Sequence, residues 1–557
     1  MELRLLLAFL LMGAVMFTTP LFYKAPPPAA KKPGAAAAPG TPGSAPPAPS
    51  AAAAAKPQAA PAAAPAAPVA AQKEDFYFVD TDLFRISFSN RGGVVTSWQL
   101  KKYKANDGQP LELVNTASKT ARPFALYFKS QKPSVDVNQA LFAAKPDPDG
   151  LGIAFEFSDG KVLARKAFRF KKNSYLAQVS TLVSENGRYI PAAIEWRGGF
   201  GDMGLANPSG VQQTVYYDTG AGKLVRHGPK DAKDGPVSAD GDFAFAGVED
   251  TYFAAAFLPE GSSTVEATIF SDHTRTAADQ AEQAFAGTAV SDGATNHFAV
   301  FVGPKDLDTL RAVNPKLEQI VDFGWFGFLA KPLFLVVNWV TEHYIHNYGW
   351  AIIAITIVLN FLLFPLKISS MKSMKKMQAL QPQIAAINDK YKGIGMRDPR
   401  KAEQNQEVMD LYKKYGVNPM GGCVPMVLQI PFFIAFYKVF TVSVEMRGAS
   451  WLWVTDLSQP EHLPIKILPI AMIASQFVMQ KMTPTTSTDP NQQRMMLFMP
   501  LIFGFMFYNF SSGLVLYYLT SNLVGIAQQW FFNRTSVAEA VARSVQIAAP
   551  RKRNGRK

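Results

Sequence analysis

The sequence predicts a multi-domain membrane protein: a polytopic α-helical bundle of six spans that carries a soluble all-β domain and a helical hairpin. Three observations support this fold class. Long apolar segments recur in the C-terminal third, the region before them alternates apolar and polar residues, and basic residues cluster beside the apolar segments. The chain is also 48% hydrophobic, which is more than a typical soluble protein contains.

The N-terminal part contains an apolar segment and a linker. Residues 1–23 are apolar from Leu5 onward after one early cation, Arg4, which is typical of a signal peptide or of an uncleaved transmembrane anchor. We favour the anchor because the apolar stretch is long for a signal peptide. Residues 24–74 are almost entirely Ala and Pro, so they cannot bury a core and form an extended tether.

Residues 75–305 are predicted to form the all-β domain. Short runs such as LFRISFSN and HFAVFVG alternate apolar and polar residues and are separated by Gly, Asp, Asn and Pro. This period of two predicts a mostly antiparallel β-sandwich. The region contains no run of 18 apolar residues, so we expect it to be soluble.

Residues 306–347 are helical in pattern and rich in aromatic residues. The stretch IVDFGWFGFLAKPLFLVVNWV contains Asp322, Lys331 and Pro332 within apolar residues. We expect an amphipathic helix that lies in the membrane interface, with its aromatic rings at the level of the headgroups. A spanning helix is the alternative.

Residues 348–534 are predicted to hold five further spans. The expected spans are 350–366, 418–440, 467–481, 495–510 and 514–532. Between the first two of these, residues 367–416 have the pattern of two amphipathic helices outside the bilayer. Apolar side chains recur there every three or four residues: Met371, Met374, Met377 and Leu380. They could pack between the two helices or form an adaptable surface for hydrophobic partners.

The distribution of cations predicts the orientation. Residues 367–414 contain eleven Lys and Arg, and the tail after Phe532 contains seven, whereas the loop 443–462 contains one. By the positive-inside rule, the hairpin and the basic tail 535–557 are cytoplasmic. Six spans then place the N-terminus inside and the β-domain outside. The tail has no aromatic residues among its cations, which a folded RNA-binding platform would need, and we expect no DNA partner.

The membrane part carries no pattern typical of catalysis. We find no nucleophile with a base, no Gly-rich phosphate loop and no paired carboxylates, so we expect no enzyme, no cofactor and no metal. The single cysteine, Cys423, excludes an intramolecular disulfide.

The spans do contain uncharged polar residues. Thr356 and Asn360 share one helix face, and Gln476 shares another with Gln480. An unpaired polar group in hydrocarbon costs about 2–7 kcal/mol, so these faces must meet one another or water. Hydrogen bonds between helices and a water-filled groove are both consistent with this pattern.

Four stretches in the last 210 or so residues carry a family resemblance. They are FPLKISSMKSMKKMQALQPQI, NPMGGCVPMVLQIPFFIAFY, QKMTPTTSTDPNQQRMMLFMP and SSGLVLYYLTSNLVGIAQQ. Together they resemble the YidC/Oxa/Alb membrane protein insertases. The layout of anchor, tether, β-domain and five further spans is similar to the Gram-negative type, and FRISFSNRGGVVTSWQL is similar to the start of its periplasmic β-supersandwich.

The resemblance implies a membrane protein insertase and chaperone of the bacterial inner membrane. Its five-helix core would form a hydrophilic groove, open to cytoplasm and lipid, that guides nascent transmembrane segments, alone or with the Sec translocon. The candidate groove residues are Thr356, Asn360, Gln429, Gln476, Tyr517, Tyr518 and Ser521. The hairpin residues Met371, Met374, Met377 and Leu380 would receive substrate, and the hairpin and basic tail would approach the ribosome.

Asn360 departs from the family pattern. The family usually has an arginine at this position, so the resemblance leaves this groove without its fixed cation. Lys438 is an unsuitable substitute because it lies near the opposite end of its span. Two other functions remain open at this point: a solute transporter or channel, and a sugar-active enzyme in the β-domain.

Overall fold

The computed structural model describes residues 67–535 apart from 206, 262–263, 278–279, 395–397, 419–423 and 484–489. The predicted anchor, most of the predicted tether, Cys423 and the tail beyond residue 535 lie outside the described residues.

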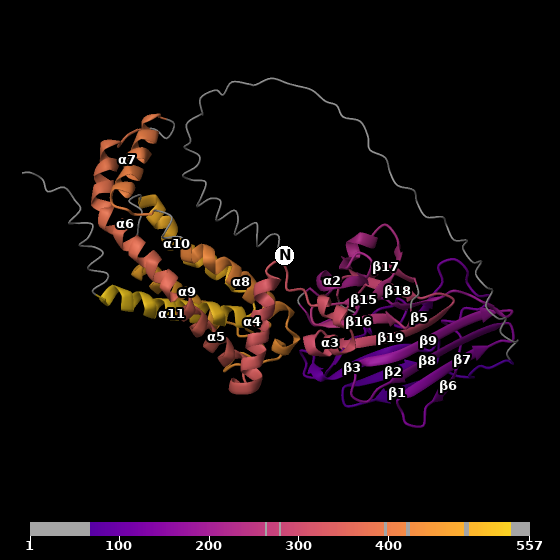
Figure 1. Cartoon of the computed structure of the whole chain (residues 1–557). Helices are drawn as coiled ribbons and strands as arrows, with labels where there is room; N and C mark the ends of the chain where they lie inside the picture. The colour runs from indigo at the N-terminus through magenta and orange to yellow at the C-terminus, as the bar shows by residue number, and fades with distance from the viewer. Residues whose placement is uncertain are drawn as a thin grey trace, which may run out of the picture.

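Residues 76–304 form antiparallel sheets, which confirms the all-β prediction for this region (Figure 1). One sheet has four strands in the order β1 (Phe76–Asp80), β2 (Phe84–Ser89), β3 (Val94–Lys104) and β4 (Pro110–Glu112). A second has five, in the order β14 (Val237–Gly241), β17 (Val265–Thr274), β18 (Gln283–Ser291), β11 (Ala193–Trp196) and β5 (Ala125–Tyr127).

The third and largest sheet has ten strands. Nine follow the order β13 (Lys223–His227), β12 (Gln213–Asp218), β15 (Phe243–Glu249), β16 (Phe253–Pro259), β19 (Thr295–Pro304), β9 (Leu176–Glu185), β8 (Val162–Phe170), β7 (Gly152–Ser158) and β6 (Ala143–Pro146). The tenth, β10 (Arg188–Tyr189), pairs with β9. Two short helical segments, α2 (Pro208–Val211) and η2 (Pro229–Ala232), lie in the connections.

The core of the β-domain is dense and aromatic. Trp98 is buried, and its ring lies 6.2 Å from that of Phe124 and 6.1 Å from that of Trp196. Strand β8 supplies part of this core because its side chains alternate between the buried and the exposed face. Lys166 is buried in the same strand, and its ammonium group donates to the carbonyl oxygens of Gly92 and Phe124 at 2.7 Å. Burial lowers the pKa of Lys166 to about 7.

A short helical region connects the sheets to the bundle. It comprises α3 (Leu307–Val313), η3 (Pro315–Ile320), α4 (Gly327–Val340) and the π-helical turn η4 (Thr341–Ile345). His346 ends that turn in the left-handed conformation, and Asn347 caps the next helix by accepting from the Trp350 N–H. On α4, Ala330, Leu333, Phe334 and Val337 are buried, whereas Trp339 is exposed.

The remainder of the described chain is helical, as predicted for the core. The helices are α5 (Tyr348–Leu362), α6 (Phe364–Lys390), α7 (Arg400–Lys414), α8 (Val424–Val442), α9 (Ile467–Met482), α10 (Pro490–Phe507) and α11 (Ser512–Arg534). A 3-10 turn, η6 (Val444–Met446), follows α8.

The stretch 350–366 is not one continuous helix, as the predicted span requires. Helix α5 ends at Leu362, and α6 begins at Phe364 and continues to Lys390. Pro365 in the first turn of α6 has no N–H to donate backward and fits the start of a helix. The last residues of the predicted span therefore belong to the helix that forms the hairpin.

A test of helix length and hydropathy over the described residues finds no single helix that meets the criteria for a membrane span. The pair Gly327–Ile345 and Tyr348–Leu362 meets them together and is bent by 115°. Residues 427–442, 467–482 and 498–507 are shorter apolar helices.

The sheets and the helices occupy opposite ends of the molecule, and α6 and α7 extend farthest from the sheets (Figure 1). A buried ion pair joins the two parts. The Arg447 guanidinium, in the loop after α8, lies 2.5 Å from the Asp202 carboxylate of the β-domain, and both side chains are less than 10% exposed.

Lys438 of α8 makes a second charged contact between the bundle and the connecting region. Its ammonium group lies 3.7 Å from the Asp322 carboxylate.

Candidate functional site: a polar groove among the helices

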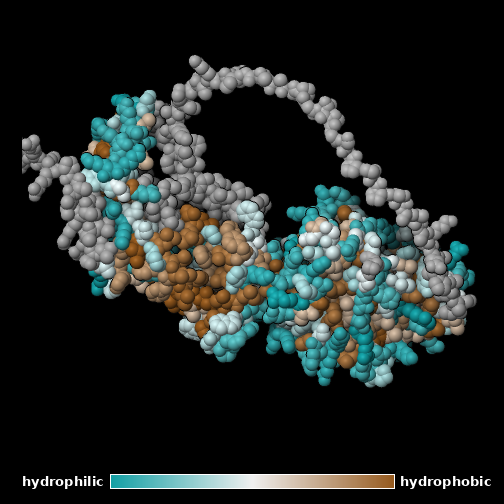
Figure 2. Space-filling model, viewed as in Figure 1, coloured by the Kyte–Doolittle hydropathy of each residue, from teal (hydrophilic) through white to brown (hydrophobic). Residues whose placement is uncertain are grey.

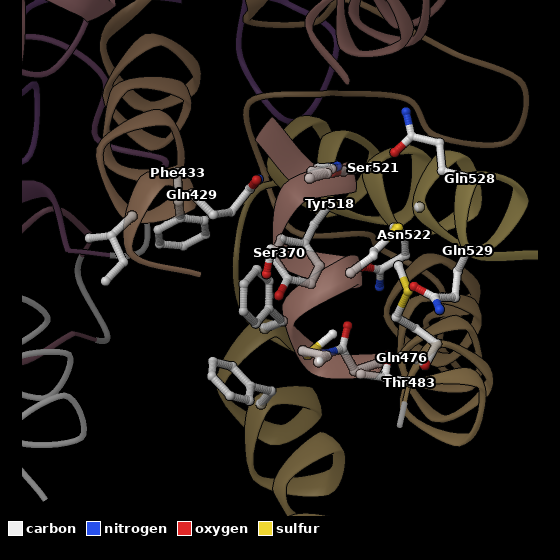
Figure 3. Close-up of a pocket in the computed structure, with 18 residues that line it drawn as sticks. Ser370, Gln429, Phe433, Gln476, Thr483, Tyr518, Ser521, Asn522, Gln528 and Gln529 are labelled. Carbon is white, nitrogen blue, oxygen red and sulfur yellow. Dashed lines mark hydrogen bonds between the residues drawn. The ribbon is translucent and has the colours of Figure 1, made fainter. Parts of the chain in front are cut away.

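A groove with a volume of about 380 Å³ lies between α6, α8, α9, α10 and α11. Figure 3 shows amide and hydroxyl side chains from α6, α8, α9 and α11 around it. Its polar lining, besides Lys367, consists of Ser370, Gln429, Gln476, Thr483, Tyr518, Ser521, Asn522, Gln528 and Gln529. Apolar side chains such as Phe433, Met479 and Phe503 complete the walls. The groove is therefore amphipathic.

Helix α11 provides much of the polar wall. Tyr518, Ser521, Asn522, Gly525 and Gln529 recur at intervals of three or four residues, so they lie on one helix face. Gly525 lets α9 come close, because a Cβ atom there would lie 2.2 Å from the terminal methyl group of Met479. The small residue thus brings the polar faces of the two helices together.

Four of the seven predicted groove residues line the groove: Gln429, Gln476, Tyr518 and Ser521. Gln429 also donates through Nε2 to the Tyr517 hydroxyl at 2.6 Å. The Gln476 Oε1 atom is buried and has no hydrogen-bond partner among the described residues. Such an atom fits a site that water or a polar segment enters.

The other three, Thr356, Asn360 and Tyr517, are buried behind the lining. The Thr356 hydroxyl donates to the Ile352 carbonyl at 2.6 Å, and the Tyr517 ring stacks on Phe436 at 3.9 Å. Asn360 donates through Nδ2 to the Thr356 carbonyl at 2.8 Å. In this structure these three side chains support the groove wall.

The structure places a cation beside Asn360, which corrects the expectation of an uncharged groove. The Lys367 ammonium group donates to Asn360 Oδ1 at 2.6 Å, and Lys367 lines the groove. The Ser521 hydroxyl lies 3.4 Å from the same amide, and Gln528 donates to the Asn360 carbonyl at 3.1 Å. Lys438, as expected, is not part of the lining and contacts Asp322.

The predicted groove residues did not include six polar residues of the lining: Lys367, Ser370, Thr483, Asn522, Gln528 and Gln529. A signal was present for two of them, because Asn522 and Gln529 lie four and eleven residues after Tyr518 on the same helix face. Lys367 lies seven residues after Asn360, which also corresponds to one face. Lys367 was assigned to the basic segment 367–416 outside the bilayer, so it was not considered as a groove residue.

The hairpin residues do not form an exposed surface in this structure. Met377 and Leu380 are buried with Ile384 and Val417 between α6 and α7, and Met371 packs against Phe532 of α11. Met374 is half-buried and lines the groove beside Met371. Met371 and Met374 thus belong to the groove, whereas Met377 and Leu380 stabilise the hairpin.

The outer surface of the bundle is apolar. Figure 2 shows a broad brown zone on the helical part, between the hydrophilic hairpin and the β-domain. Large apolar side chains of the bundle that are more than half exposed include Val358, Phe361, Leu362, Ile502 and Phe505. An apolar surface of this extent is typical of contact with lipid or a partner protein.

One carboxyl group beside the link between the two parts has a shifted pKa. Burial, together with the neighbouring Asp306 carboxyl group, raises the pKa of Glu445 in η6 to about 8, although Ser443 donates to it at 2.7 Å. Glu445 is therefore largely protonated at neutral pH.

Comparisons with known proteins agree with this architecture. The family model described as 60Kd inner membrane protein matches residues 339–539, and that described as YidC periplasmic domain matches residues 77–336. Membrane protein insertase YidC of Geotalea daltonii is 35% identical over 486 residues, which cover 82% of this chain and 86% of that protein. The insertase of Syntrophus aciditrophicus is 36% identical and is covered to 86% of its length.

The chain belongs to the YidC membrane protein insertase family. The resemblance noted from the sequence is thereby confirmed. Among solved structures, a crystal structure described as an active YidC insertase with its first transmembrane domain resolved covers 83% of this chain and 93% of its own. It is 19% identical with a TM-score of 0.36, so the assignment rests on the sequence relatives.

Proposed function

We propose that this chain is a membrane protein insertase and chaperone that guides nascent transmembrane segments into the inner membrane through the groove. The observation that carries the proposal is the combination of a polar groove inside the bundle with an apolar surface outside it. The groove offers hydrogen-bonding partners to a hydrophilic segment that would otherwise lose them in hydrocarbon. This reduces a cost of about 2–7 kcal/mol for each polar group.

In the proposed orientation, the chain crosses the membrane six times with both termini in the cytoplasm. The β-domain is periplasmic, and the hairpin of α6 and α7 is cytoplasmic. The eleven cations within 367–414 support this orientation. Helix α4 lies along the interface with Trp339 at the headgroups, which agrees with the 115° bend between it and α5.

The substrates are nascent membrane proteins, which reach the groove from the hairpin side. We propose that the basic tail 535–557 and the hairpin contact the ribosome, whose RNA is anionic, and that the chain works alone or beside the Sec translocon. Met371 and Met374 are the hairpin residues that a hydrophobic segment would meet at the groove. The chaperone role needs no catalytic residue, so we assign none.

Site-specific photo-crosslinking tests the groove. A crosslinker is placed at Gln429, Gln476 or Ser521, which line the groove, and ribosome-bound chains of a single-span client are then presented. The matched control is Leu523, which lies on the same helix as Ser521 but is 53% exposed on the outer surface. We expect the groove positions to capture the hydrophilic tail of the client. Capture at Leu523 alone would contradict the groove assignment.

A further inference from the structure

Two segments of the β-domain are rich in lysine. The first, residues 101–109, contains the end of β3 and its turn to β4, and the second, residues 171–174, is the turn between β8 and β9. Together they carry five exposed lysines: Lys101, Lys102, Lys104, Lys171 and Lys172. Asp107 is the one acidic residue within the two segments. We call these two segments the basic end of the β-domain.

The two segments of the basic end lie close together. The Phe170 ring at the end of β8 is 5.6 Å from the Phe84 ring, and Phe84 pairs with Leu100 of β3. The hydroxyl groups of Tyr103, in the first segment, and Tyr175, directly after the second, also act on each other electrostatically. The lysines therefore form one positively charged surface.

The basic end is the part of the β-domain that meets the helical bundle. The Tyr103 ring lies 5.2 Å from the Phe253 ring, and the Arg447 guanidinium lies 5.8 Å from the centre of that same ring. Arg447 belongs to the loop between α8 and α9. Beside the second segment, the Val302 N–H donates to the Tyr175 carbonyl at 3.0 Å, where β19 leads toward α3 and the bundle.

The loop between α8 and α9 has the side chains of a membrane interface. Leu452 and Ile465 are more than half exposed, and Trp453 is exposed while its Nε1 donates to Glu461 at 2.7 Å. Such tryptophans are typical of the level of the lipid headgroups. Figure 2 shows hydrophilic surface on the β-domain directly beside the apolar zone of the bundle. Headgroups that surround this loop therefore lie next to the basic end.

Most of the positive charge of the basic end is not neutralised by the described part of the chain. Lys101 pairs with Asp80, whereas the other four lysines form no ion pair with a described residue. Asp147 and Asp149, in the loop before β7, pair with Arg169 at 2.8 and 2.5 Å. The four lysines are thus free to bind an anionic group from outside the protein.

We propose that the basic end of the β-domain docks on anionic phospholipid headgroups of the periplasmic leaflet. This inference rests on the proposed function and on its orientation, in which the β-domain is periplasmic. Lysines are attracted to an anionic lipid surface over about one Debye length, which is about 8 Å at physiological salt. The contact adds a second attachment beside the Arg447–Asp202 pair and holds the β-domain against the membrane.

The test measures how closely the basic end approaches the lipid. A fluorophore is attached to Asn173→Cys, an exposed position in the second segment, in the full chain with Cys423→Ser. The protein is reconstituted in vesicles of phosphatidylcholine with or without about one-third phosphatidylglycerol. Both kinds of vesicle contain a lipid with a nitroxide on its headgroup, which quenches a nearby fluorophore. The amplitudes of the quenched and unquenched lifetimes give the ratio of docked to undocked β-domain.

Removal of lysines from either segment should lower this ratio in the vesicles that contain phosphatidylglycerol. Each lysine close to an anionic surface should contribute about fivefold, so each pair contributes about 25-fold. The two variants are Lys102→Gln with Lys104→Gln, and Lys171→Gln with Lys172→Gln. Salt at about 1 M, where the Debye length is about 3 Å, should lower the ratio of the parent protein in the same way.

The matched control removes two exposed lysines from the opposite end of the β-domain, in the variant Lys132→Gln with Lys161→Gln. Lys161 lies in the turn between β7 and β8, and Lys132 is two residues before Ser134, whose N–H donates to Glu185 at the end of β9. The ratio of this variant should equal that of the parent protein.

Three results would overturn the inference. They are an equal ratio with and without phosphatidylglycerol, a ratio that neither lysine pair of the basic end changes, and a drop of equal size in the control variant, which would assign the effect to net charge. Failure of the proposed function looks different, because the vesicles would then insert no client above the level of protein-free vesicles, whatever the fluorophore reports.

Discussion

The β-domain and the helical bundle distribute polar and apolar side chains in opposite ways. Among the described residues, the β-domain exposes only Phe76, Phe78 and Val237 of its large apolar side chains, whereas the bundle exposes them on most of its helices. Inside, the β-domain packs aromatic rings against one another, and the bundle encloses amides and hydroxyls.

This difference indicates that the β-domain is adapted to water and the outer surface of the bundle to lipid. In water, burial of apolar area stabilises the β-domain, and its buried charges such as Lys166 need hydrogen-bond partners. In lipid, exposed apolar surface costs nothing, so the interior of the bundle is available for polar residues. Substitutions of equal size should therefore affect the two parts differently.

The largest effect is expected in the aromatic core. Phe88 is fully buried, and its ring lies 5.0 Å from that of Phe168. Phe88→Ala should lower the free energy of unfolding by about 3–5 kcal/mol because it leaves a cavity. Chemical denaturation of the full chain in detergent measures this. Phe76→Ala, at a position 56% exposed, should change it by less than about 0.5 kcal/mol.

The next effect concerns the ion pair between the two parts. Asp202→Ala leaves the Arg447 charge buried without its partner, which should cost about 3–5 kcal/mol locally. We expect faster proteolysis of the connection between residues 305 and 326. In the double variant Asp202→Leu with Arg447→Leu no charge is left unpaired, so proteolysis should return toward the wild-type rate. Equal proteolysis in all three proteins would contradict a role for the pair.

Glu445 should make the stability depend on pH. Its pKa in the folded protein is about 8 and its ordinary value is 4.5, so the folded state binds the proton more tightly. Stability should therefore fall as pH rises between these values, by on the order of 1–2 kcal/mol from pH 6.5 to 8. The measurement is Tm of the full chain at both pH values.

The control for that measurement is Glu445→Gln, which keeps an acceptor for Ser443 and cannot ionise. Its Tm should fall less over the same interval. Charged or titratable neighbours are Asp306, Tyr103, Tyr348 and Arg447, and they are the same in both proteins. A drop of equal size in both proteins would assign the pH dependence to another group.

The smallest effect on stability is expected in the groove. Gln476→Leu removes an amide whose Oε1 lacks a partner, so the free energy of unfolding should change by less than about 0.5 kcal/mol. Insertion of clients with polar tails should nevertheless slow. This separation between stability and insertion would be absent if Gln476 only joined helices. Denaturation and an insertion assay on the same preparation distinguish the two.

The sequence predicted the parts of the molecule that follow a period. The period of two predicted the antiparallel strands such as β8, and intervals of three and four predicted the amphipathic helices of the hairpin, α6 and α7. The prediction failed where a single backbone position decides the outcome. The break at Leu363 places the last residues of the predicted span in α6, the helix to which Lys367 belongs.

The sequence also could not predict which group each polar side chain contacts. Thr356 and Tyr517 have polar groups on the expected faces, but contacts with Ile352 and Gln429 occupy them inside the wall. For Met377 and Leu380 both interpretations remained open, and burial between α6 and α7 favours packing. Such outcomes depend on how far each helix is rotated toward its neighbours, which periodicity leaves undetermined.

In the orientation that we propose, the Arg447–Asp202 pair has a consequence for the depth of the groove in the membrane. The loop that carries Arg447 joins α8 to α9, and both helices line the groove. In the orientation we propose, the charged surface of the β-domain cannot enter hydrocarbon. By holding this loop against the β-domain, the ion pair fixes the distance between the groove and the periplasmic surface, and so the length of hydrophilic chain that a client must carry across.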